Sequence, residues 1–156
     1  MVNILLIIIP TKVFMARQFK LNIRVYYEDT DAGGIVYYAN YLKYLERART
    51  EMIYSLGLKH HILDEKFGFQ IVVSHCDISF KKPALFEDHL TIQTELIELS
   101  AVKLIMNQKV FKVDCWTNKK KEELVVDAKV TLACVNKLGK PVKMHKDSFK
   151  LFKSCL

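Results

Sequence analysis

The chain has 156 residues, of which 51% are hydrophobic and 26% are charged, and its formal net charge is +7. This length fits one globular domain with a core large enough to need neither disulfides nor a structural metal. The basic residues are scattered along the chain and are not interleaved with aromatic residues on one element, so their pattern does not predict nucleic-acid binding. Two interpretations of the charge stay open: a solvated lysine-rich surface, or attraction of an anionic partner.

The cysteines and histidines bear on metals and on the cellular compartment. No two cysteines form a CxxC pair, the cysteine spacing fits no zinc motif, and the histidines form no HxxxH pair. We therefore expect no metal and no cofactor, and thiols that act as small buried hydrophobic groups in a reducing compartment. The four cysteines are Cys76, Cys115, Cys134 and Cys155.

The first residues are apolar, but they do not resemble a membrane or export segment. The run from Ile4 to Ile9 is too short to span a bilayer, and it lacks the basic flank and the cleavage site of a signal peptide. We therefore expect a cytoplasmic protein without a transmembrane segment. Because MARQFKLNIRVYYED, starting at Met15, reads as a natural beginning, residues 1–14 are expected to be an extension outside a single domain of residues 15–156.

The expected elements are a strand, a long helix and then four strands with short connections. The helix, from about Asn40 to Leu56, is indicated by apolar residues at every third or fourth position. Asn40 is its expected N-cap, and Gly57 suits the position just beyond its end. A short helical or irregular link is expected over 60–67 and a terminal helix over 146–152. The strands are expected over 19–27, 69–80, 90–99, 102–116 and 122–136.

This order predicts an α+β fold. Strands joined by short turns form antiparallel pairs, and one amphipathic helix must bury its apolar stripe against their sheet. A five-stranded antiparallel sheet wrapped around one long central helix is the outline of a hotdog fold. One face of such a sheet is left for a partner, so we expect a homo-oligomer, either a dimer or a tetramer.

The segment from Arg24 to Leu56 carries the candidate chemistry. Its acidic residues include Asp29 and Asp31, and Gly33 and Gly34 follow immediately before the helix. From the local sequence, Asp31 is either the residue that forms an Asx-turn before the glycines or a reactive carboxylate. Asp29 is expected to shape the turn. The N–H groups near the start of a helix have no intrahelical acceptor and can stabilise an oxyanion.

The residues YEDTDAGGIVYYANYLKYLERARTE closely resemble the 4-hydroxybenzoyl-CoA thioesterase family, in its YbgC-like branch. FKKPALFEDHLTIQTEL and the strand ELVVDAKVTLACVN also resemble that family, and the likeness extends from about residue 19 to about 150. The resemblance implies a hotdog fold, dimers assembled into tetramers, hydrolysis of acyl-CoA thioesters with small or short acyl groups, and Asp31 as the catalytic carboxylate. Many YbgC-like members carry His where this chain has Tyr38, which puts in doubt a proton relay through that side chain.

These expectations assign roles to the neighbouring residues. Asp31 would act as nucleophile or as general base, and backbone N–H groups between Ile35 and Tyr38 would hold the thioester oxygen. Asp31 and Tyr38 are the expected catalytic residues, and the Tyr38 ring is expected to be either a pocket wall or a core aromatic. Lys81 and Lys82 would meet the phosphates of coenzyme A. The expected substrate-contacting residues are Gly33, Gly34, Ile35, Val36, Tyr37, Asn40, Lys81 and Lys82.

Two other functions stay open. One is a non-catalytic acyl-binding or scaffold module in envelope or lipid metabolism. The other is a hotdog dehydratase, which would need a His–acid pair that the segment around Asp31 lacks. The sequence also leaves open whether the acyl group is carried by coenzyme A or by an acyl-carrier protein, since both carriers are acidic.

Overall fold

The computed structural model describes residues 18–113 and 122–156. The expectations for residues 1–14, for Cys115 and for the lysine-rich turn at 119–121 lie outside these residues. Within them, no helix combines the length and the apolar character needed to cross a bilayer.

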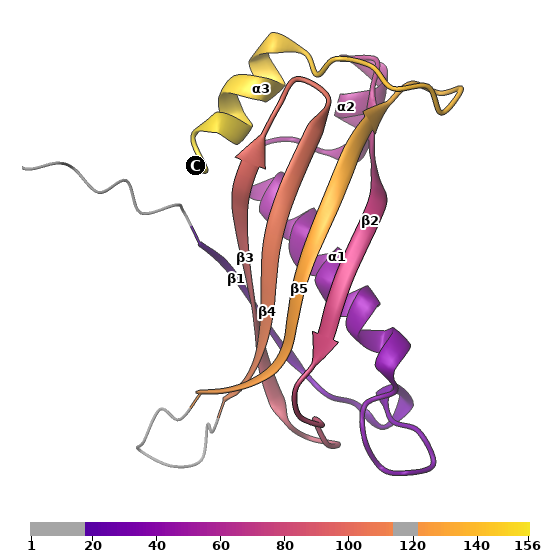
Figure 1. Ribbon diagram of the computed structural model, residues 1–156, viewed down its shortest axis with the longest axis vertical. Helices are drawn as coiled ribbons and strands as arrows, with labels where there is room; N and C mark the ends of the chain where they lie inside the picture. Colours follow the sequence, from indigo (N-terminus) through magenta and orange to yellow (C-terminus); the bar gives the residue numbers. More distant parts are fainter. Residues whose placement is uncertain (1–17, 114–121) are drawn as a thin grey trace, which may run out of the picture.

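One five-stranded antiparallel sheet forms the framework, in the order β1-β3-β4-β5-β2 (Figure 1). β1 and β2 are therefore its two edge strands. The predicted antiparallel sheet is confirmed, with strand ends that differ from the predicted ones by at most three residues. The bounds are β1 (Phe19–Arg24), β2 (Gln70–Phe80), β3 (His89–Leu99), β4 (Lys103–Val113) and β5 (Glu122–Val135).

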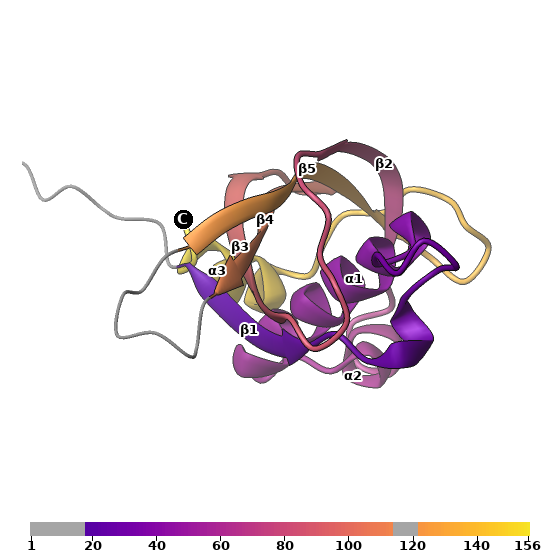
Figure 2. The same ribbon diagram turned by 90° about the horizontal axis from the view of Figure 1, so that it is seen from below.

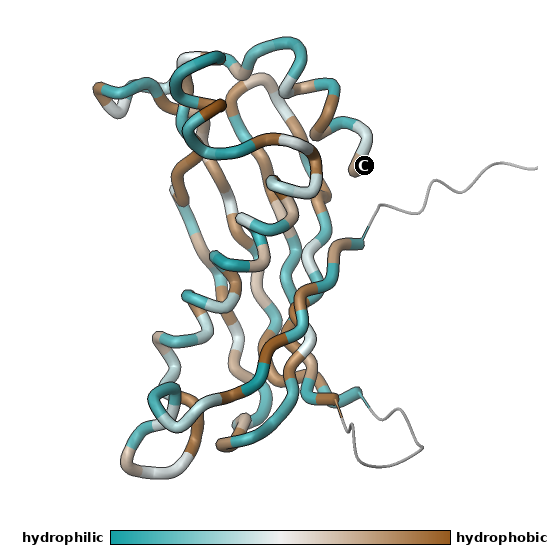
Figure 3. Tube along the Cα trace, turned by 180° about the vertical axis from the view of Figure 1, so that it is seen from behind, coloured by the Kyte–Doolittle hydropathy of each residue, from teal (hydrophilic) through white to brown (hydrophobic). Residues whose placement is uncertain are grey.

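The long helix α1 (Tyr38–Ser55) lies in the concave side of the sheet, and it crosses the strands obliquely when viewed from behind (Figures 2 and 3). The predicted stripe is buried at Tyr41, Leu45, Ala48 and Met52, which are at most 3% exposed, whereas its last member, Leu56, is only partly buried. The helix ends where Gly57 adopts a φ of +76°, which a residue with a side chain rarely adopts. This confirms the role expected of Gly57 and the hotdog arrangement as a whole.

A buried polar contact joins α1 to the middle of the sheet. Gln108 on β4 donates through Nε2 to the carbonyl oxygen of Leu45 (3.0 Å) and to Oγ1 of Thr94 (2.9 Å). Its Oε1 accepts a hydrogen bond from Nη1 of Arg49 (2.8 Å), and burial lowers the pKa of Arg49. Because Gln108 and Thr94 are fully buried, these bonds satisfy groups that water cannot reach and fix α1 along the sheet.

Three shorter helices complete the described chain: η1 (Tyr27–Asp29), α2 (His60–Glu65) and α3 (Lys146–Lys153). The first strand ends at Arg24 and does not continue to Tyr27 as expected. The reason is local: the carboxylate of Asp29 accepts the N–H of Tyr26 (2.9 Å) and closes the 3-10 turn. This turn redirects the chain toward the start of α1.

Candidate active site

The start of α1 is fastened to the preceding turn through one carbonyl group. The oxygen of Asp29 accepts the N–H of Tyr37 and Nδ2 of Asn40, both over 2.9 Å. The helix therefore begins at Tyr38 with Tyr37 as its N-cap, and the prediction that Asn40 is the N-cap is wrong. Asn40 is 7% exposed and positions the turn that carries Asp31, so the structure gives no support to its expected contact with substrate.

Asp31 is the first residue of a tight turn that contains Gly33 and Gly34. Its Oδ1 accepts the N–H of Gly33 over 2.8 Å, and its backbone carbonyl accepts the N–H of Gly34 over 2.9 Å. Gly34 has a φ of +76°, and a Cβ atom at Gly33 would lie 3.1 Å from Oδ1 of Asp31. Gly34 thus has the left-handed backbone that glycine favours, and the lack of a Cβ at Gly33 leaves room for the Asp31 carboxylate. The Asp31 side chain is exposed in the single chain.

Of the backbone N–H groups after the turn, two donate hydrogen bonds within the chain and two are open, meaning that they have no backbone acceptor among the described residues. Val36 donates to the carbonyl of Ala84 and Tyr37 donates to that of Asp29, both over 2.9 Å. The expectation that the whole run from Ile35 to Tyr38 is open is therefore wrong for these two N–H groups. Within residues 18–113 and 122–156, no backbone acceptor is found for the N–H groups of Ile35 and Tyr38, and Tyr38 lies where a helix has no internal acceptor.

A cavity of about 340 Å³ lies beside this turn and opens to the surface. Tyr38 is 60% exposed and its ring centroid lies 6.3 Å from that of Phe80, so Tyr38 is a cavity wall and not a core aromatic. Asp31 lies outside the lining, on the turn that leads into it. Sequence reasoning did not single out Phe80 or Pro83 as site residues, although Phe80 immediately precedes the two lysines. The lining residues are Ile35, Val36, Tyr38, Tyr41, Phe80, Lys81, Lys82 and Pro83.

Tyr37 faces a different environment from Tyr38. It is not part of the cavity lining, and its ring centroid lies 4.7 Å from that of Tyr38. The neighbouring hydroxyl of Tyr38 raises the pKa of Tyr37, and the negative charge of Asp31 adds to this effect. Tyr37 therefore lies between the cavity wall and the Asp31 turn, and because its pKa is raised its phenol group stays neutral at physiological pH.

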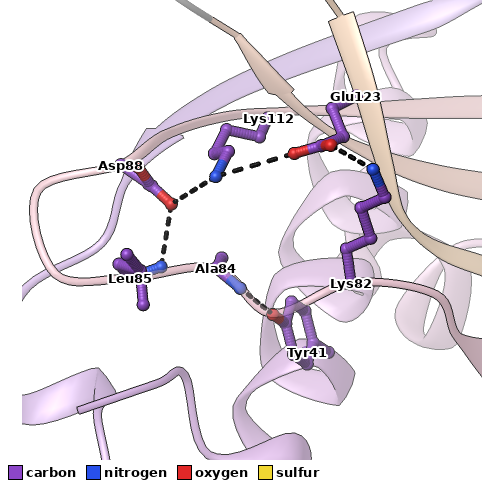
Figure 4. A network of polar contacts seen from close by, with 7 residues as sticks. All are labelled: Tyr41, Lys82, Ala84, Leu85, Asp88, Lys112 and Glu123. Carbon is purple, nitrogen blue, oxygen red and sulfur yellow. Dashed lines mark hydrogen bonds and ion pairs between the residues drawn. The ribbon is translucent and has the colours of Figure 1, made fainter.

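A chain of charged groups anchors the loop between β2 and β3 (Figure 4). Lys82 forms an ion pair with Glu123, and Lys112 lies 3.7 Å from Glu123 and 3.5 Å from Asp88. A hydrogen bond from Lys82 lowers the pKa of Glu123, and the charges of both lysines add to it. Since Lys82 is paired, it is a weaker candidate for a phosphate contact than Lys81, whose ammonium group has no ion-pair partner in the described part of the chain.

The same loop also contacts the start of α1. The N–H of Ala84 points at the hydroxyl oxygen of Tyr41 over 3.3 Å, while the carbonyl of Ala84 accepts the N–H of Val36 (Figure 4). The loop and the Asp31 turn therefore share one hydrogen-bonded unit. Among the described residues, no group of three or more His, Cys, Asp and Glu side chains is arranged to hold a metal ion.

Comparison with known sequences places the chain in a family. The model of the thioesterase-like superfamily matches residues 25–150. The acyl-CoA thioester hydrolase YbgC of Escherichia coli O6:H1 is 36% identical over 142 residues, covering 86% of this chain and 96% of that protein. The acyl-CoA thioesterase YbgC of Haemophilus influenzae is 37% identical over 131 residues, covering 83% and 90%.

Solved structures show the same fold. A probable thioesterase from Bartonella henselae superimposes with a TM-score of 0.72 at 33% identity, covering 82% of this chain and 99% of that one. The 4-hydroxybenzoyl-CoA thioesterase of Pseudomonas sp. strain CBS-3 gives a TM-score of 0.73 at 25% identity, covering 87% and 99%. The hotdog fold and the resemblance noted in the sequence are thus confirmed, and the chain belongs to the thioesterase-like superfamily.

Proposed function

We propose that this protein hydrolyses acyl-CoA thioesters, with Asp31 as nucleophile or general base. The observation that carries the proposal is the Asp31 turn itself. The N–H of Gly33 holds the Asp31 carboxylate in place, and the chain reaches the cavity wall at Ile35. The open N–H groups of Ile35 and Tyr38 are the proposed donors to the thioester oxygen as negative charge forms on it. The family and the names of the relatives support the same reaction class.

The proposed hydrolysis requires only a few catalytic groups. One water molecule is consumed, the bond between the acyl carbon and sulfur breaks, and a carboxylic acid and a thiol are released. If Asp31 attacks the acyl carbon, a mixed anhydride forms and water then cleaves it; if Asp31 acts as base, it takes a proton from the attacking water. The leaving thiolate has a pKa of about 8.5 and departs without a strong general acid, so one carboxylate and two N–H donors suffice.

The size of the cavity and the charge of Lys81 support a small acyl group that is attached to an anionic carrier. A volume of about 340 Å³ lies at the lower end of the range of small-molecule sites, and its walls are largely aromatic and aliphatic. We propose that Lys81 contacts a phosphate of coenzyme A, since its charge is not neutralised by a neighbour in the described part of the chain. An acyl-carrier protein would offer a phosphate of similar charge, so Lys81 suits both carriers.

We also propose that the enzyme acts as a homo-oligomer, a dimer or a tetramer, in the cytoplasm. The edge strand β2 leaves Val73 and Phe80 about half exposed, which a second copy could cover. Cys76 and Cys134 are free thiols, and free thiols fit a reducing compartment.

A panel assay tests the reaction directly. The purified protein is mixed with acyl-CoAs of increasing length, and thiol release is followed with a chromogenic reagent. We expect turnover of the short members, and a loss of at least about 10²-fold in Asp31→Asn. Glu28→Gln, an exposed neighbour in η1, is the matched control and should retain full activity.

The same assay separates the alternatives. Tight acyl-CoA binding without thiol release would favour a binding module. Hydration of an enoyl-CoA without thiol release would favour a dehydratase. Wild-type turnover in Asp31→Asn would show that another group performs the chemistry.

A further inference from the structure

The last part of the chain is strongly basic because it almost lacks acidic residues. Residues 137–156 contain six lysines and one acidic residue, Asp147, so they carry +5 of the formal net charge of +7. We call residues 137–153, which hold all six lysines, the basic segment. Each of these lysines is exposed, and they are Lys137, Lys140, Lys143, Lys146, Lys150 and Lys153.

Few charges of the basic segment are neutralised by neighbouring side chains. The ammonium group of Lys137 lies 3.6 Å from Oδ2 of Asp64. No other lysine of the basic segment has an ion-pair partner within residues 18–113 and 122–156. The acidic Asp147 lies 3.7 Å from Nδ1 of His145 and is not paired with a lysine there. A concentrated positive charge therefore faces solvent.

Three of the lysines form one row on α3. Lys146, Lys150 and Lys153 follow one another at spacings of four and three residues, which places them on the same side of the helix. The opposite side carries Ser148 and Phe152, which are fully buried. Like charges at these spacings destabilise a helix, so an anionic surface beside the row would stabilise α3.

The turn after β5 adds an exposed aliphatic side chain to these charges. Oδ1 of Asn136 accepts the N–H groups of Leu138 and Lys140, both over 3.0 Å, and Gly139 has a φ of +74°. These contacts fix the turn with Leu138 at its tip, where the side chain is 80% exposed. Lysines at positions 137 and 140 flank it, so an apolar group projects from the middle of a basic surface.

The basic segment crosses one end of the molecule, away from the candidate active site. The turn after β5 lies at the same end as α2 and α3, whereas the start of α1 lies at the other end (Figure 1). Between the turn and α3, the N–H of Val142 donates to the carbonyl of Cys134 (3.0 Å) and the N–H of Met144 to that of Ala101 (2.6 Å). Since α1 has 18 residues and is about 27 Å long, a surface that covers this end leaves the cavity at the start of α1 open.

We propose that the basic segment binds membranes that contain anionic phospholipids, with its lysines at the headgroup phosphates and Leu138 inserted between the headgroups. Each lysine near an anionic bilayer is attracted to it, and an aliphatic side chain gains free energy when it leaves water at the headgroup boundary. The cytoplasmic leaflet of a membrane carries such lipids, which agrees with the cytoplasmic location proposed above.

The exposed leucine favours a lipid surface over a nucleic acid. Both partners would attract the lysines through phosphate groups. Beside the phosphates, however, proteins contact nucleic acids mostly through hydrogen bonds to bases and through stacking on aromatic rings. An aliphatic side chain at the tip of a fixed turn provides neither contact, whereas the headgroup boundary of a bilayer accommodates it.

The first test measures binding to vesicles by co-sedimentation. The wild type should bind vesicles of equal parts phosphatidylglycerol and phosphatidylcholine at low ionic strength, and it should dissociate as salt is added. It should not bind vesicles of phosphatidylcholine alone. A triple variant with lysines 140, 143 and 146 changed to Gln should bind about 10²-fold more weakly, which is about 5-fold for each lysine.

A matched variant controls for net charge. Its three substitutions are Lys20→Gln, Lys43→Gln and Lys109→Gln, which remove the same charge from exposed positions outside the basic segment, and its binding should stay within about 3-fold of the wild type. An equal loss in both triple variants, or equal binding to both kinds of vesicle, would overturn the proposal. So would an absence of vesicle binding, and binding to a single-stranded oligonucleotide alone would assign the basic segment to nucleic acids.

The second test asks whether Leu138 enters the headgroup region. Leu138→Ser and Leu138→Trp leave the charge unchanged, and the exposure of this side chain means that neither should disturb the fold. Leu138→Ser should bind anionic vesicles about 5-fold or more weakly, whereas Leu138→Trp should bind at least as tightly as the wild type, because its ring suits the membrane interface. Equal affinity of all three proteins would overturn the insertion. Thiol release measured without vesicles should be unchanged in both variants, so membrane binding and the proposed hydrolysis succeed or fail separately.

Discussion

The N–H of Gly33 donates to Oδ1 of Asp31 over 2.8 Å, so the proposed catalytic carboxylate is also part of the turn that presents it. Two substitutions separate these roles. Asp31→Asn keeps an oxygen that can accept this bond, whereas Asp31→Ala removes it. We expect both variants to lose turnover, but we expect only Asp31→Ala to lose stability, by about 0.5–1.5 kcal/mol. Chemical denaturation and thiol release measure the two effects, and equal stability of the variants would contradict this structural role.

The two glycines should respond differently to alanine. In Gly33→Ala the new Cβ would lie 3.1 Å from Oδ1 of Asp31 and displace the carboxylate, so kcat should fall by at least about 10-fold with little change in KM. In Gly34→Ala the backbone at φ +76° becomes strained, which should cost about 1–2 kcal/mol of stability. Gly139→Ala has the same strain at φ +74° far from the site, and it should lose stability with unchanged kcat. A Gly33→Ala variant with wild-type kcat would contradict the placement of Asp31.

Tyr38 tests whether the side chain or the backbone acts at this position. Its N–H is one of the two open donors, while its ring forms the cavity wall with Phe80. Tyr38→Phe keeps both features, so its kcat should stay within about 3-fold of the wild type. Tyr38→Ala removes the wall and should raise KM for acyl-CoA. A loss of about 10²-fold in Tyr38→Phe would instead assign a proton-transfer role to the hydroxyl.

The sequence predicted the fold because the signals for each helix and strand are local. The stripe from Tyr41 to Met52 has helical spacing, and the alternating residues of β5 from Val126 to Cys134 are buried on one face. Gly57 ends α1 at the expected place. Each of these features depends on the periodicity of one element and its immediate flanks, which sequence analysis reads directly.

The details of the site depend on contacts between distant segments, which sequence spacing does not encode. Asn40 looked like an N-cap because that residue type favours the position, but the carbonyl of Asp29 draws the start of α1 back to Tyr38. Lys82 is equivalent to Lys81 in the sequence, but Glu123, 41 residues away, pairs with Lys82 and not with Lys81. Val36 looked like an open donor, and its N–H is occupied by Ala84.

The lysines offer a matched pair of variants. If Lys81 contacts a phosphate of coenzyme A, Lys81→Gln should raise KM by about 5-fold or more at low ionic strength, and less at high salt. Lys82→Gln should change KM less, because Lys82 already pairs with Glu123. An acyl-pantetheine, which lacks the nucleotide phosphates, is the control substrate, and the Lys81→Gln effect should vanish with it. Equal effects on both substrates would contradict a phosphate contact.

Glu123 makes the anchored loop sensitive to acid. Because Lys82 and Lys112 lower its pKa below the ordinary value of 4.5, the folded state favours the charged carboxylate more strongly than the unfolded chain does. Its contribution to stability is thus present above pH 4.5 and is lost as pH falls through the lowered pKa. Glu123→Gln should have a lower Tm than the wild type at pH 7, and the difference should shrink as the pH falls through the lowered pKa of Glu123. Glu65→Gln, an exposed residue of α2, should match the wild type throughout this range. A Tm difference that stays constant from pH 7 to pH 3 would show that Glu123 stabilises the loop by packing and not by its charge.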